Sequence, residues 1–303
     1  MAVAGRITLQ GRLSGLRTAG GRNLLLLLPA AYVVVFLLLP LLLTLVWSFW
    51  EREGFWMRPA FTPASYVTFF GGPRATVLVR TAVLAMIVTA VGLIAAYPIA
   101  YLIGMRLAPA VGRGVLLLFT IPFVVNYILR DVSWTYLLTR DGPVNTALLR
   151  LGLIHQPLDW LLFSHFAVLV GLITSYMPFM IYPIWLALTG IDRRLLEASW
   201  LLGAKPTMTF LRVTLPLSLP GVFAGLVFAF VGSFGDSAVA RILGGSGYQM
   251  MGDTITSALG VLNYPLAAAM STVVVAMMIL LLSIWFRLFD ARSLLGRVAN
   301  WRR

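Results

Sequence analysis

Few side chains in this chain of 303 residues have the types and spacing that bond-making or bond-breaking chemistry requires. The chain has no Cys, so thiolate nucleophiles, disulfides and cysteine-based metal sites are excluded. Its two histidines, His155 and His165, form no His-Glu-x-x-His pattern, and a metal site needs three or four converging ligands. We therefore expect His165 to pack in or beside an apolar segment, and we expect no metal site.

Nucleotide chemistry is also disfavoured by the sequence. A phosphate-binding loop needs Gly-Lys-Ser or Gly-Lys-Thr, whereas Lys205 stands between Ala204 and Pro206. The Gly-Gly-Ser-Gly run at 244–247 lacks the flanking strand and helix of a dinucleotide site. We expect that the chain is not an enzyme and holds no cofactor of its own.

The amino-acid composition indicates the class of protein to which this chain belongs. Hydrophobic residues make up 60% of the chain and charged residues 11%, whereas soluble domains carry about a quarter charged residues. The net charge of +13 comes from arginines in short clusters between long apolar runs, which is typical of membrane topology signals and not of a nucleic-acid surface. The sequence therefore predicts a polytopic membrane protein that does not bind nucleic acid.

Membrane-spanning helices are predicted from windows without charged residues, because a helix needs about 20 apolar residues to cross the hydrocarbon core. The third window is short, and we expect its helix to continue past Arg130 and Asp131 toward Thr139. The six windows lie between residues 22 and 51, 80 and 106, 113 and 130, 159 and 192, 212 and 236, and 253 and 287.

The distribution of Arg and Lys predicts the orientation of these six spans. With the N-terminus inside, the inner segments hold more than twice as many basic residues as the outer ones. We therefore expect both termini to be cytoplasmic. The predicted organisation is a cytoplasmic segment 1–23, a six-span domain 24–290 that includes a cytoplasmic segment 191–216, and a cytoplasmic tail 291–303.

The inner segment 191–216 differs from an ordinary short loop. Asp192 can cap a helix that is apolar over much of its surface, Gly203 lies where that helix would end, and Pro206 prevents its continuation. A second short helix is expected over 207–213, before Pro216 opens the next span. Such a helix-turn-helix suits docking into a groove on a partner protein, or alternatively resting on lipid headgroups.

A resemblance to a known family favours the first of these alternatives. The residues Glu197-Ala198-Ser199, Gly203-Ala204, Phe210 and Leu215-Pro216 resemble the coupling motif of bacterial ABC importer permeases, in which the position of Ser199 is usually Ala. In that family the coupling helix inserts into a cleft of the ATP-binding subunit. The resemblance implies that Glu197, Ala198, Ser199, Gly203, Ala204 and Phe210 couple the chain to an ATPase.

Further motifs narrow the resemblance to the spermidine/putrescine-type permeases. They are Asp141-Gly142-Pro143-Val144-Asn145, Tyr176-Met177-Pro178-Phe179-Met180, Gly235-Asp236 before Leu243-Gly244-Gly245, and Asn263-Tyr264-Pro265. Related importers of ferric iron and aminophosphonates share parts of this pattern.

The resemblance implies the fold and the assembly. The fold would be an all-α type I importer permease (MetI-like) in the bacterial inner membrane. Its partners would be a dimer of ATP-binding subunits that holds ATP and Mg, a second permease, a substrate-binding protein, membrane lipid and a small cationic substrate moved by alternating access. The outer loops 51–79, 139–158 and 237–264 would receive the binding protein.

A cationic substrate needs carboxylates and aromatic faces along its path. We expect Asp236 to face a central cavity, the alternative being a carboxylate solvated at the end of a helix. The remaining candidates have equally ordinary alternatives, since Asp131 could simply neutralise Arg130 and the aromatic residues could be interface or packing side chains. These candidates are Asp131, Trp134, Tyr127, Asn126 and Tyr176.

A self-sufficient secondary transporter is the main competing interpretation. Such proteins often contain internal repeats and ion-coupling acids at the membrane midplane. The sequence has no clear repeat, and no carboxylate lies in the middle of a predicted span. A membrane enzyme lacks a convincing nucleophile or metal site, so the importer permease is preferred.

Overall fold

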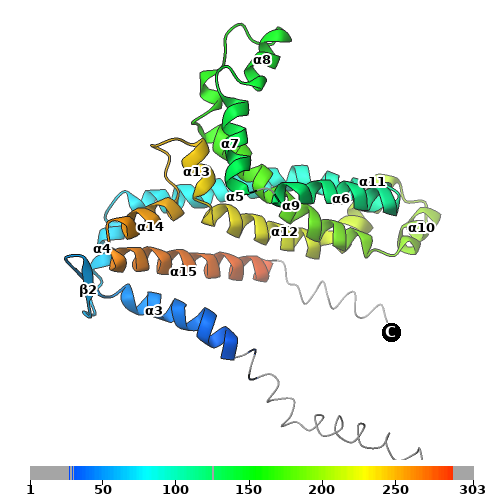
Figure 1. Ribbon diagram of the computed structural model, residues 1–303. Helices are drawn as coiled ribbons and strands as arrows, with labels where there is room; N and C mark the ends of the chain where they lie inside the picture. The colour runs from blue at the N-terminus through cyan, green and yellow to red at the C-terminus, as the bar shows by residue number, and fades with distance from the viewer. Residues whose placement is uncertain (1–26, 28, 30, 125, 289–303) are drawn as a thin grey trace, which may run out of the picture. The chain divides into compact units, whose positions relative to one another are not determined.

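The computed structural model describes residues 27, 29, 31–124 and 126–288 (Figure 1). The cytoplasmic segments expected over 1–23 and 291–303 lie outside the described residues. The described chain is predominantly helical, which confirms the predicted helical class, but it also contains a short β-hairpin that the sequence did not predict.

Four of the six predicted spans are helices long and apolar enough to cross a membrane. They are Arg74–Arg106, His165–Thr189, Pro206–Gly235 and Tyr264–Arg287. The first and third predicted spans coincide with the shorter apolar helices Ala31–Trp47 and Pro109–Ile121. The count of six spans and the cytoplasmic location of the termini therefore stay predictions.

The chain forms two compact units, and the smaller one contains the described residues up to Phe69 together with 261–273. Its elements are the π-helix η2 (Val34–Leu38), α3 (Leu39–Trp47), β1 (Glu51–Glu53), β2 (Trp56–Arg58), α4 (Ala64–Phe70) and the start of α15 (Tyr264–Leu288). The two strands pair antiparallel across a turn in which Gly54 takes φ of 61°, a conformation that glycine adopts readily. The Tyr66 hydroxyl hydrogen-bonds Ser48 at 2.7 Å and its ring packs on Phe49, which ties α4 to the end of α3.

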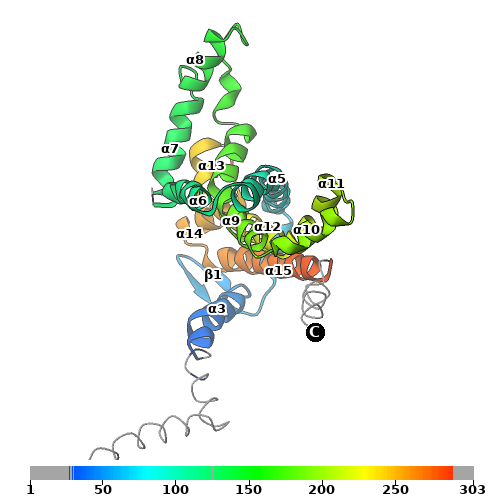
Figure 2. The same ribbon diagram turned by 90° about the vertical axis from the view of Figure 1, so that its right-hand side faces the viewer.

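The larger unit is built around three long helices, α5 (Arg74–Tyr101), α9 (His165–Thr189) and α12 (Leu215–Gly235). Each of the three packs against the other two (Figure 2). Glycines allow α12 to approach α9 closely, since a Cβ on Gly225 would lie 3.1 Å from the Cα of Met180 and one on Gly221 would overlap the Pro183 carbonyl. This spacing of two glycines four residues apart is common where membrane helices pack without a hydrophobic driving force.

Shorter helices complete the larger unit. They are the π-helix η3 (Leu102–Arg106), α6 (Pro109–Val124), α7 (Tyr127–Leu138), α8 (Pro143–Arg150), the 3₁₀ helix η4 (Asp159–Leu161), α10 (Arg193–Leu201), α11 (Pro206–Thr209), the π-helix η5 (Phe210–Thr214), α13 (Ala238–Leu243) and α14 (Met251–Gly260). Buried apolar side chains of α5, α7, α9 and α13 form one core cluster, and those of α5, α6, α9 and α12 form another.

The third predicted span differs from the expectation of one helix continuing toward Thr139. The helix breaks next to Asn126, whose ψ of 131° is extended and whose side chain caps α7 by accepting the Ile128 N–H at 2.9 Å. Beyond this break α7 runs across the direction of α6 (Figure 1) and packs against α9 and α13. An Asn that can cap a new helix therefore ends the apolar run, and it carries Arg130 and Asp131 to the side of α9.

Candidate functional site

Asp236 lies at the junction of α12 and α13, where both of its carboxylate oxygens are hydrogen-bonded. Oδ1 accepts the backbone N–H of Val239, in the first turn of α13, at 3.0 Å. Oδ2 accepts the hydroxyl of Tyr176, a residue of α9, at 2.9 Å. Asp236 therefore stabilises the start of α13, and its hydrogen bond to Tyr176 connects the end of α12 to α9.

The position of Tyr176 in α9 shows where along that helix the contact with Asp236 lies. Tyr176 lies close to the middle of the 25-residue helix His165–Thr189, about 17 Å from its first residue at a rise of 1.5 Å per residue. Asp236 thus lies beside the centre of a span, although it follows the last residue of α12 in sequence. No carboxylate lies in the middle of a predicted span in the sequence, but helices of different offset bring Asp236 beside the middle of α9.

Asp131 belongs to the same group of polar side chains. It is 0% exposed, and neither of its carboxylate oxygens has a hydrogen-bond partner among the described residues. It lies within electrostatic range of Asp236 and of its neighbour Arg130. Arg130 donates from Nη2 to the Ser175 hydroxyl at 3.1 Å, next to Tyr176 on α9. The structure therefore gathers Asp131, Asp236 and Tyr176, with Arg130 and Ser175, into what we call the charged cluster.

Gly232 is a component of this site that the sequence analysis missed. A Cβ at this position of α12 would overlap the ring of Tyr176. The absence of a side chain thus lets the Tyr176 ring lie close to α12, within reach of Asp236. The alternation of small and apolar residues in α12 was visible in the sequence, but the identity of the facing residue was not.

The other three candidates lie in different surroundings. Trp134 is half-buried and packs against the core cluster formed by α5, α7, α9 and α13. Asn126 is exposed and serves as the cap of α7. Tyr127 is the first residue of α7, and its side chain lies outside the described part of the structure. A role in the substrate path stays a prediction for all three.

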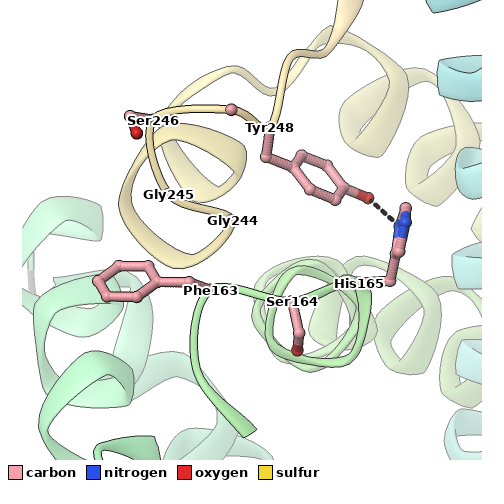
Figure 3. A pocket seen from close by; sticks show the side chains of 8 residues that line it. Phe163, Ser164, His165, Gly244, Gly245, Ser246 and Tyr248 are labelled. Carbon is pink, nitrogen blue, oxygen red and sulfur yellow. Dashed lines mark hydrogen bonds between the residues drawn. The ribbon is translucent and has the colours of Figure 1, made fainter. Parts of the chain in front are cut away.

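His165 begins α9 and borders a cleft of about 530 Å³ lined by Phe163, Ser164, His165 and residues 244–248 (Figure 3). Arg80 donates to His165 Nε2 at 2.9 Å, and the Tyr248 hydroxyl lies 3.0 Å from Nδ1. Burial raises the pKa of Tyr248, while Arg80 acts in the opposite direction with its guanidinium carbon 4.8 Å from the centre of the ring. The loop 244–248 thus forms one wall of a cleft at the end of α9 remote from α10.

The inner segment 191–216, which we call the coupling segment after the motif it resembles, has the helix ends that the sequence predicted. The Asp192 carboxylate caps α10 by accepting the Arg194 N–H at 2.9 Å, and Gly203 follows the helix with φ of 78°. Glu197 and Ala198 are exposed, and Leu201 and Leu202 are 90% and 88% exposed. The tip of the segment therefore presents large apolar side chains without a covering element among the described residues.

The second part of the segment corrects the prediction of a separate helix over 207–213. The chain stays helical from Pro206 to Gly235, through α11, η5 and α12, so the segment continues directly into the next span. Ser199, at the position where the resembled family has Ala, hydrogen-bonds the Thr209 hydroxyl at 2.7 Å and so links α10 to α11.

Phe210 attaches the segment to α5. Its ring meets those of Tyr97 and Tyr101 edge-on, each with 5.8 Å between ring centres. The Tyr97 hydroxyl lies 3.0 Å from that of Ser218 on α12. The coupling segment is thus connected through side chains to two of the three central helices, whereas Ala204 lies half-buried in the turn between α10 and α11.

Comparison with known proteins adds three findings. The model of the family described as "Binding-protein-dependent transport system inner membrane component" matches residues 88–294. The spermidine/putrescine transport system permease protein PotB of Haemophilus influenzae is 33% identical over 270 residues, covering 88% of this chain and 92% of that protein. The permease protein PotC of Escherichia coli is 33% identical over 117 residues, which cover 39% of this chain and 42% of PotC.

A solved structure shows the same fold at low sequence identity. A chain of a bacterial alginate ABC transporter, crystallised with its alginate pentasaccharide-bound periplasmic protein, aligns with a TM-score of 0.65 and 17% identity, covering 91% of this chain and 97% of that one. The family match includes the second half of α5, all of α9 and α12, the charged cluster and the coupling segment. The chain therefore belongs to the family of inner membrane components of binding-protein-dependent transport systems.

Proposed function

We propose that this chain is the permease subunit of an ATP-driven importer that moves a small cationic solute of the polyamine class by alternating access. The observation that carries the proposal is the charged cluster, in which two carboxylates and a tyrosine lie beside the centre of α9. Acidic side chains at this depth are costly in a membrane, and they commonly mark the path of a substrate or ion.

The chemistry of the cluster favours a cationic substrate. Asp131 has no hydrogen-bond partner among the described residues, so a primary ammonium group that reaches it could donate to it without breaking a hydrogen bond within the protein. Because Asp131 is 0% exposed, the packing around it would have to open first. The Tyr176 ring offers an aromatic face beside Asp236. An anionic aminophosphonate would meet two like charges there. The similarity to spermidine/putrescine permeases supports the same substrate class.

Energy for transport would come from a separate dimer of ATP-binding subunits that holds ATP and Mg. The exposed tip of α10 and the turn after it, with Glu197, Leu201 and Leu202, would dock into that partner. Closure of the partner would pull the segment 191–216, and the contacts of Phe210 would pass the movement to α5.

The remaining assembly would consist of a second, homologous permease and a substrate-binding protein. Similarity to both PotB and PotC supports a pair of related permeases. Under the predicted orientation the cleft beside His165 lies on the outer face, where the loop 237–264 would meet the binding protein. Six spans with both termini in the cytoplasm complete the proposed topology.

An uptake assay of the Asp236→Asn variant tests the proposal. Asn keeps an oxygen for the Val239 N–H but removes the charge, so we expect KM for spermidine to rise about tenfold to a hundredfold, as for the loss of a charged hydrogen bond. Asp159→Asn is the control, because Asp159 is exposed and paired only loosely with Arg140 at 3.5 Å. Equal uptake by wild type and Asp236→Asn, or strong competition by ferric iron instead of polyamines, would refute the proposed cationic path.

A further inference from the structure

Arg130 is the cation of the charged cluster. It precedes Asp131 on α7, and its guanidinium is held against α9 by the hydrogen bond to Ser175, which is itself buried. The same guanidinium acts electrostatically on both Asp131 and Tyr176. Three charged side chains from two separate parts of the chain, Arg130, Asp131 and Asp236, therefore share one site beside the centre of α9.

Electrostatics explains why a cation is needed there. Two carboxylates close together in an interior of low dielectric repel each other and lose their hydration. A guanidinium offsets part of this cost, and Arg keeps its charge inside a protein. With one positive and two negative groups, the cluster retains one unbalanced negative charge.

We infer that Arg130 is a tethered counter-cation of the substrate site, which neutralises one of its two carboxylates and thereby sets the substrate charge that the site accepts. The inference rests on the proposed function and deepens it. Asp131 is fully buried and still lacks a hydrogen-bond partner among the described residues, so Arg130 balances charge without filling the hydrogen-bonding positions of that carboxylate. The site can therefore hold one ammonium group of a polyamine at a time.

The net charge of the site affects both how tightly a polyamine binds and how fast it is released. A site with two unbalanced carboxylates would bind a polyamine tightly and would release it slowly, whereas a transporter needs binding that is reversible within each cycle. Removing the Arg130 charge should thus lower KM and kcat together. It should also favour spermidine over putrescine, because spermidine carries one more positive charge.

The experiment compares Arg130→Gln, Arg130→Lys and Arg150→Gln in uptake of labelled spermidine and putrescine. For Arg130→Gln we expect KM for spermidine to fall about tenfold, with a comparable fall in kcat and a shift of preference toward spermidine. Arg130→Lys, which keeps a positive charge, should restore most of the wild-type behaviour. Arg150 is exposed on α8 and serves as the control for a lost arginine.

Two results would overturn the inference: a raised KM in Arg130→Gln, or equal behaviour of Arg130→Gln and Arg130→Lys. If Arg130→Gln is not inserted stably, Ser175→Ala tests the same tether and should change KM in the same direction by a smaller factor. The Asp236→Asn variant separates the two proposals. If it raises KM while the Arg130 variants leave it unchanged, only the counter-cation is refuted, whereas absence of polyamine uptake by wild type removes both.

Discussion

At the scale of single residues, the geometry of the charged cluster depends on Gly232. The Tyr176 hydroxyl reaches Asp236 because its ring lies where a side chain at position 232 would stand. An Ala there would push the aromatic ring away, and the helical backbone of α12 cannot yield easily because Gly221 and Gly225 hold it close to α9. The glycine thus determines the position of a polar contact although it has no side chain of its own.

We predict that Gly232→Ala raises KM for spermidine, because displacement of Tyr176 breaks its hydrogen bond to Asp236. Overpacking of this kind costs about 1 to 3 kcal/mol, which corresponds to roughly fivefold to a hundredfold in affinity. Uptake kinetics measure the change. Gly235→Ala is the matched control three residues further along α12, where a Cβ would meet nothing within 4 Å. Equal KM values for the two variants would contradict the role of Gly232.

The sequence identified the acidic and aromatic members of this cluster but not their relation. Asp236 and Tyr176 are 60 residues apart, and the hydrogen bond between them depends on the offset of α12 along α9, which hydropathy does not specify. Asp131 was weighed as a partner of Arg130, and the structure adds a hydrogen bond from Arg130 to Ser175 that the sequence could not indicate. Residue types therefore predicted the chemistry, and helix packing decided which residues share a site.

At the scale of elements, the apolar windows predicted the long helices well because length and hydropathy suffice for a span. The apolar windows mispredicted helix boundaries where capping or turn residues interrupt the apolar run. Asn126 starts a new helix inside an apolar stretch, and Pro206 begins a helix that continues into the next span. A hairpin of Glu51–Glu53 and Trp56–Arg58 is too short to produce a periodic signal. Capping and turn chemistry, and not hydrophobicity, set these boundaries.

The prediction at the scale of elements concerns the attachment of the coupling segment to α5. Phe210→Ala removes the edge-on contacts with Tyr97 and Tyr101, so movement of α10 should reach α5 less effectively. We expect transport per ATP hydrolysed to fall severalfold in proteoliposomes while ATP hydrolysis by the assembled complex persists. Aromatic pairs contribute about 0.5 to 1.5 kcal/mol beyond area burial, which is consistent with an effect of this size.

Phe228→Ala provides the control for this experiment. Phe228 is also an aromatic residue of the same helical stretch, Pro206–Gly235, but it is 58% exposed and faces away from the core. If both variants reduce transport per ATP equally, general loosening of the helix explains the result and Phe210 has no special part in coupling.

At the scale of the whole molecule, the exposed apolar tip of the coupling segment bears on how the chain assembles with other subunits. Membership of the family of transport-system components implies that this chain works with other subunits. In the coupling segment, Leu201 and Leu202 expose the largest fractions of apolar side chain to solvent. A lipid-facing helix could also use such side chains. The two possibilities differ in what they predict for assembly, because only protein docking requires a particular shape.

We predict that Leu201→Asp combined with Leu202→Asp abolishes recovery of the ATP-binding subunit when the tagged chain is purified in mild detergent. Introduced carboxylates would have to be buried in the partner's groove, at a cost of several kcal/mol for each unpaired charge. The purified chain itself should stay folded, because both positions are almost fully exposed. Leu153→Asp, at a 68% exposed position beyond α8, should leave recovery unchanged. Retention of the ATPase by the double variant, with normal coupled uptake, would instead assign this turn to the lipid surface.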